Sequence, residues 1–285
     1  MRTGLTIAAL PVVIALAACT HSSDPPPPPP PTADEAARAS HAHIVSGANT
    51  LLRGDRLGYD ASDDEVERVN TTCEEDRCAI GFLSVSKASN FGVDGWELEL
   101  LRERRGVILV RQDVSGTYGD AEAFGGWLEH SLFATQTSLF TNDDDPDHGA
   151  TIVSNYSLGF SRGENPSAAQ GSARWEGLML GRDVRAAPSR GQVIRGDADV
   201  TVDFAADSLT ADVAFTGVVN IETGDLHDDM AWHGMTVEDG GFARTDAPDD
   251  TISGRFYGPG EEEVGGVFEQ GGIAGAFGGR RTSAP

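Results

Sequence analysis

The chain has 285 residues, of which 39% are hydrophobic, enough to bury a core in one large domain or two small ones. It carries 45 Asp and Glu residues against 21 Lys and Arg residues, a formal net charge of −24. Because a field of this sign repels phosphate groups, the charge argues against nucleic acid as a partner and against membrane binding through a basic face.

The first eighteen residues have the pattern of a secretory signal peptide. Arg2 provides a basic start, an apolar run extends from Leu5 to Ala18, and the string LAAC ends at Cys19. The run is too short for a membrane-spanning helix. LAAC resembles a bacterial lipobox, in which the cysteine receives acyl chains such as palmitate and becomes the first residue of the mature chain. We therefore expect residues 1–18 to be removed and Cys19 to be lipidated; the alternative is an ordinary signal with a chance cysteine.

Residues 19–32 read as an anchored, proline-rich tether. Seven consecutive prolines, Pro25–Pro31, fit neither a helix nor the interior of a sheet, and they extend as polyproline II over roughly 22 Å. Such a spacer would hold the folded part away from the lipid surface. The next residues, Thr32–Glu35, fit a helix capping box, and apolar side chains at helical spacing predict one amphipathic helix up to about Arg53.

Cys73 and Cys78 are the other two cysteines, spaced as CEEDRC. In an oxidising compartment this spacing suits a small disulfide loop, which would stabilise the fold by roughly 2 kcal/mol in the chain-entropy description. A metal site is the alternative. It lacks a second cysteine pair or a nearby histidine to complete a tetrahedral shell.

From Cys78 onward, short apolar runs broken by Gly, Asp and Asn predict a chain that is nearly all β. TNDDDPDHG reads as a hydrated acidic turn, since it lacks the register of a calcium-binding loop. The polar stretch SRGENPSAAQG is the best internal boundary, so we assign residues 33–165 to the helix plus a β-rich region and residues 166–285 to a second domain. The runs predicted as strands are AIGFLSVS, GWELELL, GVILVRQDV, GGWLEHSLFAT and TIVSNYSLGF.

In the C-terminal part of the chain, apolar side chains fall on alternate positions, the period of a half-buried strand. Three segments repeat an aliphatic residue, a glycine and a phenylalanine with this period. A glycine on the inner face of a coiled sheet lets the strand bend and leaves volume for a ring from a neighbouring strand. The repeat predicts successive strands of a small closed barrel, with these residues inside and Glu269 outward in solvent. The triplets are Ile252, Gly254 and Phe256; Val264, Gly266 and Phe268; and Ile273, Gly275 and Phe277.

The same segment resembles the closing strands of the β-barrel domain of transferrin-binding protein B and its relatives, surface lipoproteins of Gram-negative bacteria. Upstream, ARWEGLML followed by RGDADVTVDF is similar to the first strands of that domain. The resemblance covers about residues 170–281. The matching positions near the C-terminus are Gly254, Phe256, Tyr257, Gly258, Pro259, Val264, Gly265, Gly266, Phe268, Gly275, Ala276, Phe277, Gly278 and Arg280.

What the resemblance implies is an eight-stranded antiparallel barrel, preceded by a smaller β-rich sheet called a handle, and a role in binding. Relatives bind host transferrin, complement factor H, or haem and haemoproteins. The matching residues build the barrel, and the ligand-contacting loops of the family vary. The resemblance therefore transfers the architecture and assigns no binding residue.

Two strings contain residues that carry chemistry in other proteins. GFSRG matches the G-x-S-x-G pattern of hydrolases, but Ser161 is not followed by the helix that this pattern requires. In LHDDMAWHG, His227, His233 and the two aspartates between them have donors that suit a metal or could flank a haem, although the acids favour a solvated turn. The sequence predicts no catalytic residue and no metal site, and His227 and His233 are its candidates if haem binds.

Taken together, these patterns predict a mainly β, lipid-anchored protein of the outer membrane, on its periplasmic face or at the cell surface. Its mechanism would be binding of a protein or haem-type ligand by barrel loops held on rigid strands, without catalysis or a required cofactor. A structural envelope lipoprotein without a specific ligand is the alternative. A serine hydrolase built on Ser161 is a more distant one.

Overall fold

The computed structural model shows a chain made of β-strands throughout its described part. The described residues are 52–60, 67–69, 71–74, 77–80, 83–86, 99–116, 119–140, 150–167, 171–185, 192–204 and 209–282. All of them belong to one compact unit, Pro31–Pro285. The predicted N-terminal helix falls mostly on residues outside the described ranges, but its predicted end, Leu52 and Arg53, lies in the first strand instead.

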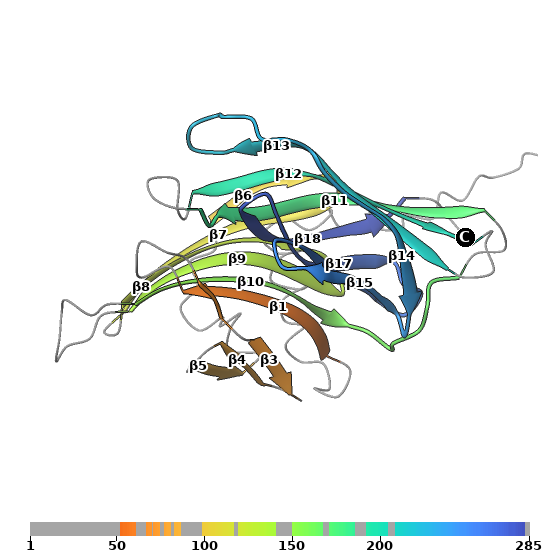
Figure 1. Ribbon diagram of the computed structural model, residues 1–285, viewed down its shortest axis with the longest axis horizontal. Coiled ribbons are helices and arrows are strands. Elements are labelled where there is room, and N and C mark those ends of the chain that lie inside the picture. Colours follow the sequence, from red (N-terminus) through yellow and green to blue (C-terminus); the bar gives the residue numbers. More distant parts are fainter. Residues whose placement is uncertain are drawn as a thin grey trace, which may run out of the picture. The chain divides into compact units, whose positions relative to one another are not determined.

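The eight C-terminal strands form a closed antiparallel barrel, in which each strand pairs with the next and the last pairs with the first (Figure 1). The barrel predicted from the sequence is confirmed. Gly271 and Gly272, with φ values of 61° and 78°, form the two-residue turn of the last hairpin. The strands are β11 (Ser172–Asp183), β12 (Val193–Asp203), β13 (Thr210–Asn220), β14 (Met230–Glu238), β15 (Gly241–Ala247), β16 (Asp250–Tyr257), β17 (Glu263–Gln270) and β18 (Ile273–Arg281).

The interior of the barrel is filled by apolar side chains from alternate positions of its strands. The aliphatic and phenylalanine members of all three triplets belong to this core, as the alternation predicts. Phe215 lies at its centre, because its ring centroid is 4.7 Å from that of Phe268 and 5.3 Å from that of Phe277. Contacts of this kind favour tilted geometries and add to the free energy of burial.

The triplet glycines leave the volume that these rings occupy. A Cβ atom on Gly275 would lie 2.6 Å from Cε1 of Phe268, and one on Gly266 would lie 2.8 Å from Cε1 of Phe277. Backbone carbonyl oxygens of Leu180 and Ser253 lie closer still to the two Cβ positions, so moving the rings would not make room and both positions require glycine. The pattern of glycine followed by phenylalanine is therefore a consequence of closing a narrow barrel around large side chains.

Seven strands from the earlier part of the chain form an antiparallel sheet in the order β2-β1-β10-β9-β8-β7-β6. The predicted strand GGWLEHSLFAT is wrong as a single element, because residues 128–130 form the turn between β8 and β9. The apolar side chain of Leu128 continued the strand pattern through this turn. It is apolar because it is buried in the core between the sheet and the barrel. The strands are β1 (Leu52–Asp60), β2 (Glu67–Val69), β6 (Glu99–Arg104), β7 (Val107–Gly116), β8 (Gly119–Trp127), β9 (Ser131–Phe140) and β10 (Ala150–Phe160).

A separate antiparallel sheet of three short strands contains the two internal cysteines. Its strands are β3 (Thr71–Glu74), β4 (Arg77–Ile80) and β5 (Leu83–Ser86), so the predicted run AIGFLSVS is divided between two of them. The backbone register places Cys73 directly opposite Cys78. The disulfide between them stays a prediction.

The seven-stranded sheet packs on the outer face of the barrel through a second apolar core. Side chains of β1, β7, β8, β9 and β10 meet outward-pointing side chains of β11, β17 and β18, such as Leu178, Val267 and Ala276. The strands β17 and β18 are consequently buried on both faces. Glu269 does point out of the barrel as predicted, but it is only 7% exposed, so the expectation that it faces solvent is wrong. The outer face of β17 is covered by the sheet.

One buried carboxylate ties the barrel to the turn between β8 and β9. Glu263 is 2% exposed and accepts hydrogen bonds from the Glu129 amide (2.7 Å), the His130 amide (3.0 Å) and the Ser131 hydroxyl (2.7 Å). Burial raises the pKa of this carboxyl, whereas the three donors and the nearby Arg280 act in the opposite direction. Donors from the sheet thus compensate a charge that the barrel could not bury alone.

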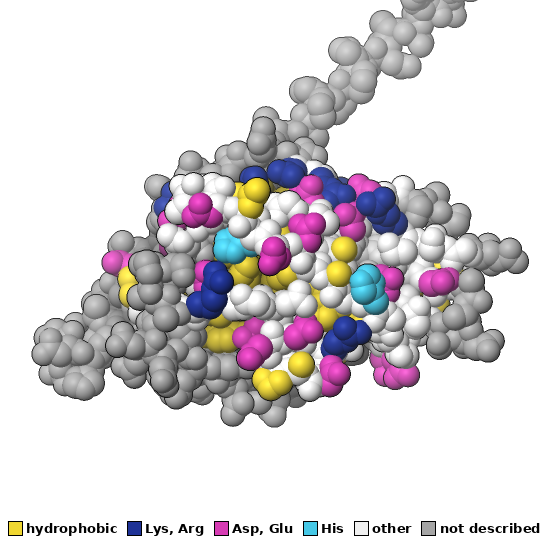
Figure 2. Space-filling view, turned by 45° about the horizontal axis from the view of Figure 1, so that its top comes forward, with side chains coloured by type: hydrophobic (Ala, Val, Ile, Leu, Met, Phe, Trp, Pro, Cys, Tyr) yellow, Lys and Arg dark blue, Asp and Glu magenta, His cyan; other side chains and the backbone are white. Residues whose placement is uncertain are grey.

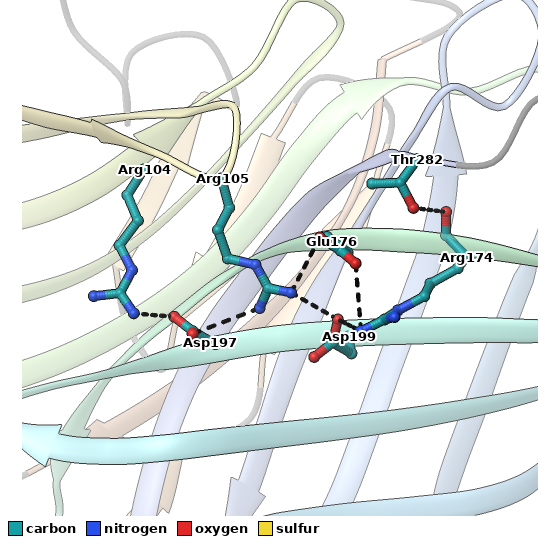
Figure 3. Close-up of polar contacts among 7 residues, drawn as sticks. All are labelled: Arg104, Arg105, Arg174, Glu176, Asp197, Asp199 and Thr282. Atoms are coloured by element: carbon teal, nitrogen blue, oxygen red, sulfur yellow. Dashed lines mark hydrogen bonds and ion pairs between the residues drawn. The ribbon is translucent and has the colours of Figure 1, made fainter.

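A network of charges makes a second tie, at the hairpin between β6 and β7 (Figure 3). Arg105 lies in its two-residue turn and donates to Asp199 on β12 at 2.9 Å, while its guanidinium lies 3.3 Å from Glu176 on β11. Arg104 donates to Asp197, and Arg174 of the barrel shares Asp199 at 2.8 Å. The partly exposed arginines and carboxylates alternate, so each charge has neighbours of opposite sign.

We expect Phe268→Ala to destabilise the protein by about 3–5 kcal/mol, because it removes a central ring from a packed core and leaves a cavity. The midpoint and slope of denaturant unfolding measure the change. Glu238→Ala, at an exposed position near the end of β14, is the control and should shift the midpoint little. Equal shifts for the two variants would show that the inward face has been assigned wrongly.

We expect Glu263→Ala to cost about 2–5 kcal/mol, because it leaves buried donors of the β8–β9 turn without an acceptor. Hydrogen exchange should show faster exchange at the Glu129 and His130 amides. The matched control is Glu262→Ala, at the exposed neighbouring position, where the carboxylate accepts a single hydrogen bond from the Gly260 amide. Unchanged exchange in the β8–β9 turn would contradict a tie through Glu263.

Candidate functional site

The two ends of the barrel differ in what covers them. At the end that we call the linker end, residues 161–167 lead in from the sheet and the Asn165 side chain accepts a hydrogen bond from the Gly240 amide at 2.9 Å. Arg281 also donates to the Ser167 carbonyl there. The opposite end, which we call the distal end, carries the β11–β12 connection, the β13–β14 loop (residues 221–229) and the β15–β16 and β17–β18 turns. In Figure 1 the β13–β14 loop lies on the other side of the barrel from the C-terminus.

A hydrogen-bonded cluster of three side chains lies at the distal end of the barrel interior. The Asp250 carboxylate accepts hydrogen bonds from the Trp232 indole at 2.7 Å and from the Gln270 amide at 2.8 Å. The Trp232 ring itself is fully buried and packs edge-on against Phe215. Because side chains fill the interior, the surfaces at which a ligand can meet the barrel are its loops and its uncovered outer strands.

The β13–β14 loop has a fixed backbone that is organised by Asn220. The Asn220 side-chain oxygen accepts hydrogen bonds from the Glu222 amide (2.9 Å) and the Thr223 amide (3.2 Å), and its side-chain nitrogen donates to Gln192 at 2.7 Å. The backbone amide of Asn220 in turn donates a hydrogen bond to the backbone carbonyl of Asp225. An asparagine side chain that replaces backbone partners in this way is a common means of ordering a tight loop.

Two large hydrophobic side chains of this loop are exposed to solvent. Leu226 is 81% exposed and Ile221 is 40% exposed; elsewhere in the described residues only Leu139 is similarly exposed, at 51%. Neither residue is among the candidates predicted from the sequence. A usable signal was present, because IETGDLHDD places aliphatic residues within a polar turn where no strand face requires them.

The exposed surface around these residues is acidic. Glu222, Asp225, Asp228 and Asp229 lie in the same loop, all exposed, and the loop contains no Lys or Arg. Figure 2 shows acidic side chains spread over the described face of the molecule, interspersed with a smaller number of basic ones. The loop therefore combines an apolar tip with a locally negative potential.

The two candidate histidines lie on different elements. His227 is half-buried in the β13–β14 loop, where its amide donates to the Val218 carbonyl. His233 is on β14 with its side chain 72% exposed, and its Nδ1 atom is 3.4 Å from a carboxylate oxygen of Asp212. In the described part of the chain, no group of three His, Cys, Asp or Glu side chains is placed to hold a metal ion.

His233 lies where β14 and β15 are joined by few backbone pairs. The register of β14 on β15 comprises two residue pairs at the linker end, Val237 with Phe242 and Glu238 with Gly241. Further along, the Arg244 guanidinium donates to the His233 carbonyl at 2.6 Å, which satisfies a backbone acceptor that the ladder leaves open. The His233 backbone thus has a structural partner, while its imidazole faces solvent.

Ser161 lies in the turn that follows β10. It is almost fully buried, and its hydroxyl accepts a hydrogen bond from the Gly163 amide at 3.2 Å. The described residues that follow it form the linker and then strand β11, so the strand–turn–helix of a hydrolase nucleophile is not formed there.

Several predicted features lie outside the described residues. These are the signal peptide, Cys19, the proline tether and the acidic turn at residues 141–149. No helix in the described part of the chain has the length and hydropathy to span a membrane.

A closed eight-stranded antiparallel barrel preceded along the chain by a separate β-sheet is the architecture expected from the sequence resemblance. Residues 164–281 match the profile of the family described as "C-lobe and N-lobe beta barrels of Tf-binding protein B". The C-terminal domain is therefore a barrel of the transferrin-binding protein B type, and the resemblance stated from the sequence is confirmed. No curated protein matches the chain.

Similar solved structures share little sequence with this chain. A double mutant of transferrin-binding protein B from Haemophilus parasuis Hp5 has 14% identity and a TM-score of 0.36 over 81% of this chain and 45% of its own. The N-lobe domain of lactoferrin-binding protein B from Moraxella bovis has 13% identity and a TM-score of 0.36 over 81% of this chain and 99% of its own. A crystallised surface lipoprotein has 12% identity and a TM-score of 0.39 over 82% and 99%. The chain spans a little under half the length of the Haemophilus protein.

Proposed function

We propose that this protein is a non-catalytic binding module, anchored by lipid to the outer membrane, that presents the distal loops of its barrel to a protein partner. The observation that carries the proposal is a barrel with a filled interior whose distal end bears an ordered loop with exposed apolar side chains. Loops held on rigid strands are a common place for binding residues, because the scaffold fixes their positions.

The family match supports the class of partner. The matched barrels belong to a protein named for binding transferrin, and one similar structure belongs to a protein named for binding lactoferrin. The ordering of the β13–β14 loop by Asn220 adds a physical reason, since a loop that is already ordered loses less conformational entropy when it binds.

The anchor and the location follow from the N-terminal sequence. Lipidation of Cys19 would hold the protein at the outer membrane, and the tether at residues 19–32 would separate the fold from the lipid surface. Digestion of intact cells with an external protease distinguishes the cell surface from the periplasmic face. A disulfide between Cys73 and Cys78 fits either location, because both are oxidising.

We expect Cys19→Ser to release the protein from the membrane fraction, because a single acyl chain already gives only marginal binding and the variant would carry none. Partitioning between aqueous and detergent phases measures the effect. A Cys73→Ser/Cys78→Ser double variant is the matched control, since it replaces cysteines at positions unrelated to the anchor and leaves no unpaired thiol. A Cys19→Ser protein that partitions like the wild type would exclude lipidation at this residue.

Haem is the specific alternative ligand, and a titration separates it from a protein partner. We expect no saturable Soret shift when the full chain, purified in detergent, is titrated with haem, because His233 is exposed beside Asp212 and His227 lies in a different element. A saturable shift that His227→Ala or His233→Ala abolishes would instead identify an axial ligand and overturn the protein-ligand proposal.

A further inference from the structure

The tip of the β13–β14 loop has a side-chain composition that restricts the kind of partner it can bind. Leu226 projects with 81% of its surface in solvent, on a loop whose other aliphatic residue, Ile221, is also exposed. Single exposed hydrophobic residues are ordinary on protein surfaces. Two in one short ordered loop are available to a complementary pocket on a partner.

The backbone holds Leu226 in this position. Leu226 forms an isolated antiparallel bridge with Val219, and the His227 amide, next along, donates to the Val218 carbonyl. On the other side of the loop, Asp229 accepts a hydrogen bond from the Gly217 amide at 3.0 Å. The leucine is therefore presented by a loop that is pinned at both sides, so its exposure is a property of the fold.

Carboxylates outnumber basic groups around the apolar tip. Nearby arginines include Arg195, whose backbone pairs with Val219, and Arg182, which is buried and already bound to Glu122. Besides the four carboxylates of the loop, Asp246 and Asp249 at the neighbouring β15–β16 hairpin are exposed, and residues 245–250 contain no Lys or Arg. A partner with an acidic surface would be repelled here. A partner with Lys and Arg around an apolar pocket would be attracted during approach and would match the loop once bound.

We infer that Leu226 and Ile221 dock into an apolar pocket on a partner protein whose rim is basic. The inference rests on the proposed function and specifies the chemistry of its partner. The apolar residues supply most of the buried area, and the surrounding carboxylates of Glu222, Asp225 and Asp228 select a positively charged rim. Because these carboxylates are exposed, their contribution is chiefly to association rate and selectivity, and it weakens as salt rises.

The test uses a displayed library of random peptides selected against the full-length protein in detergent. We expect enriched peptides to combine aliphatic or aromatic residues with Arg or Lys. Leu226→Ser should weaken binding of a synthetic enriched peptide by roughly tenfold or more, since one buried aliphatic side chain contributes that much. Leu139→Ser is the matched control, because it removes another exposed leucine, on β9, and should leave the affinity within about twofold.

The charge requirement has its own pair of variants. Asp228→Asn combined with Glu222→Gln should weaken binding and reduce its dependence on salt concentration. Asp239→Asn, in the β14–β15 turn at the linker end, is the control; its φ of 50° is one that asparagine adopts readily, and it should change neither quantity.

Four outcomes would overturn the inference. Enriched peptides without basic residues, or binding indifferent to Leu226→Ser, would show that another part of the protein is used, and the proposed binding function would still stand. Binding that requires calcium and is lost on chelation would indicate that the carboxylates bind a cation and do not contact a basic rim directly. A library that gives no binder at all, with a display control that works, would count against both the inference and the proposed function.

Discussion

The structure depends on the burial of β17 and β18 on both faces. Their inward side chains, such as Phe268 and Phe277, fill the barrel, while outward ones, such as Val267 and Ala276, form the core shared with the sheet. A strand buried on both sides cannot tolerate large side chains on both, because the barrel is narrow and the sheet lies close. Glycine and alanine therefore alternate with phenylalanine. A Cβ atom on Gly278, for example, would lie 2.8 Å from a ring carbon of Phe133 in the sheet.

Polar groups at this interface are paired across it. Arg182 on the outer face of β11 is almost fully buried and donates to Glu122 of β8 at 3.1 Å, and Arg255 of β16 lies 3.3 Å from the carboxylate of Asp55 on β1. Burial lowers the pKa of Arg182 and raises that of Asp55, and in each pair the opposite charge acts against that shift. Docking the sheet in a different position would leave such charges buried without partners, so the polar contacts favour one specific docking arrangement.

This arrangement decides which part of the barrel is free to bind. The sheet covers β11, β17 and β18 on the outside and also contacts β16 and β12 through ion pairs, and the linker contacts the β14–β15 turn at one end. The distal loops are not covered by the sheet or by the linker. Residues of the ordered loop at 221–229 can therefore contact a partner without breaking contacts that stabilise the fold.

The sequence by itself determined the class of fold, because alternation and the glycine–phenylalanine triplets have one simple explanation in a narrow closed barrel. The family resemblance followed from the same residues.

Period-two patterns are local. They indicate which side chains share a face of a strand, but they do not indicate what covers the other face. For that reason the sequence places Glu269 in solvent and Leu128 within a strand, and an equally local helical spacing puts Leu52 and Arg53 at the end of a helix. Only the tertiary structure decided that the sheet covers one side of the barrel, that Ser161 is buried in a turn, and that Leu226 is exposed. Each of these depends on residues distant in sequence, as Glu263 and the β8–β9 turn show, and no local pattern records such contacts.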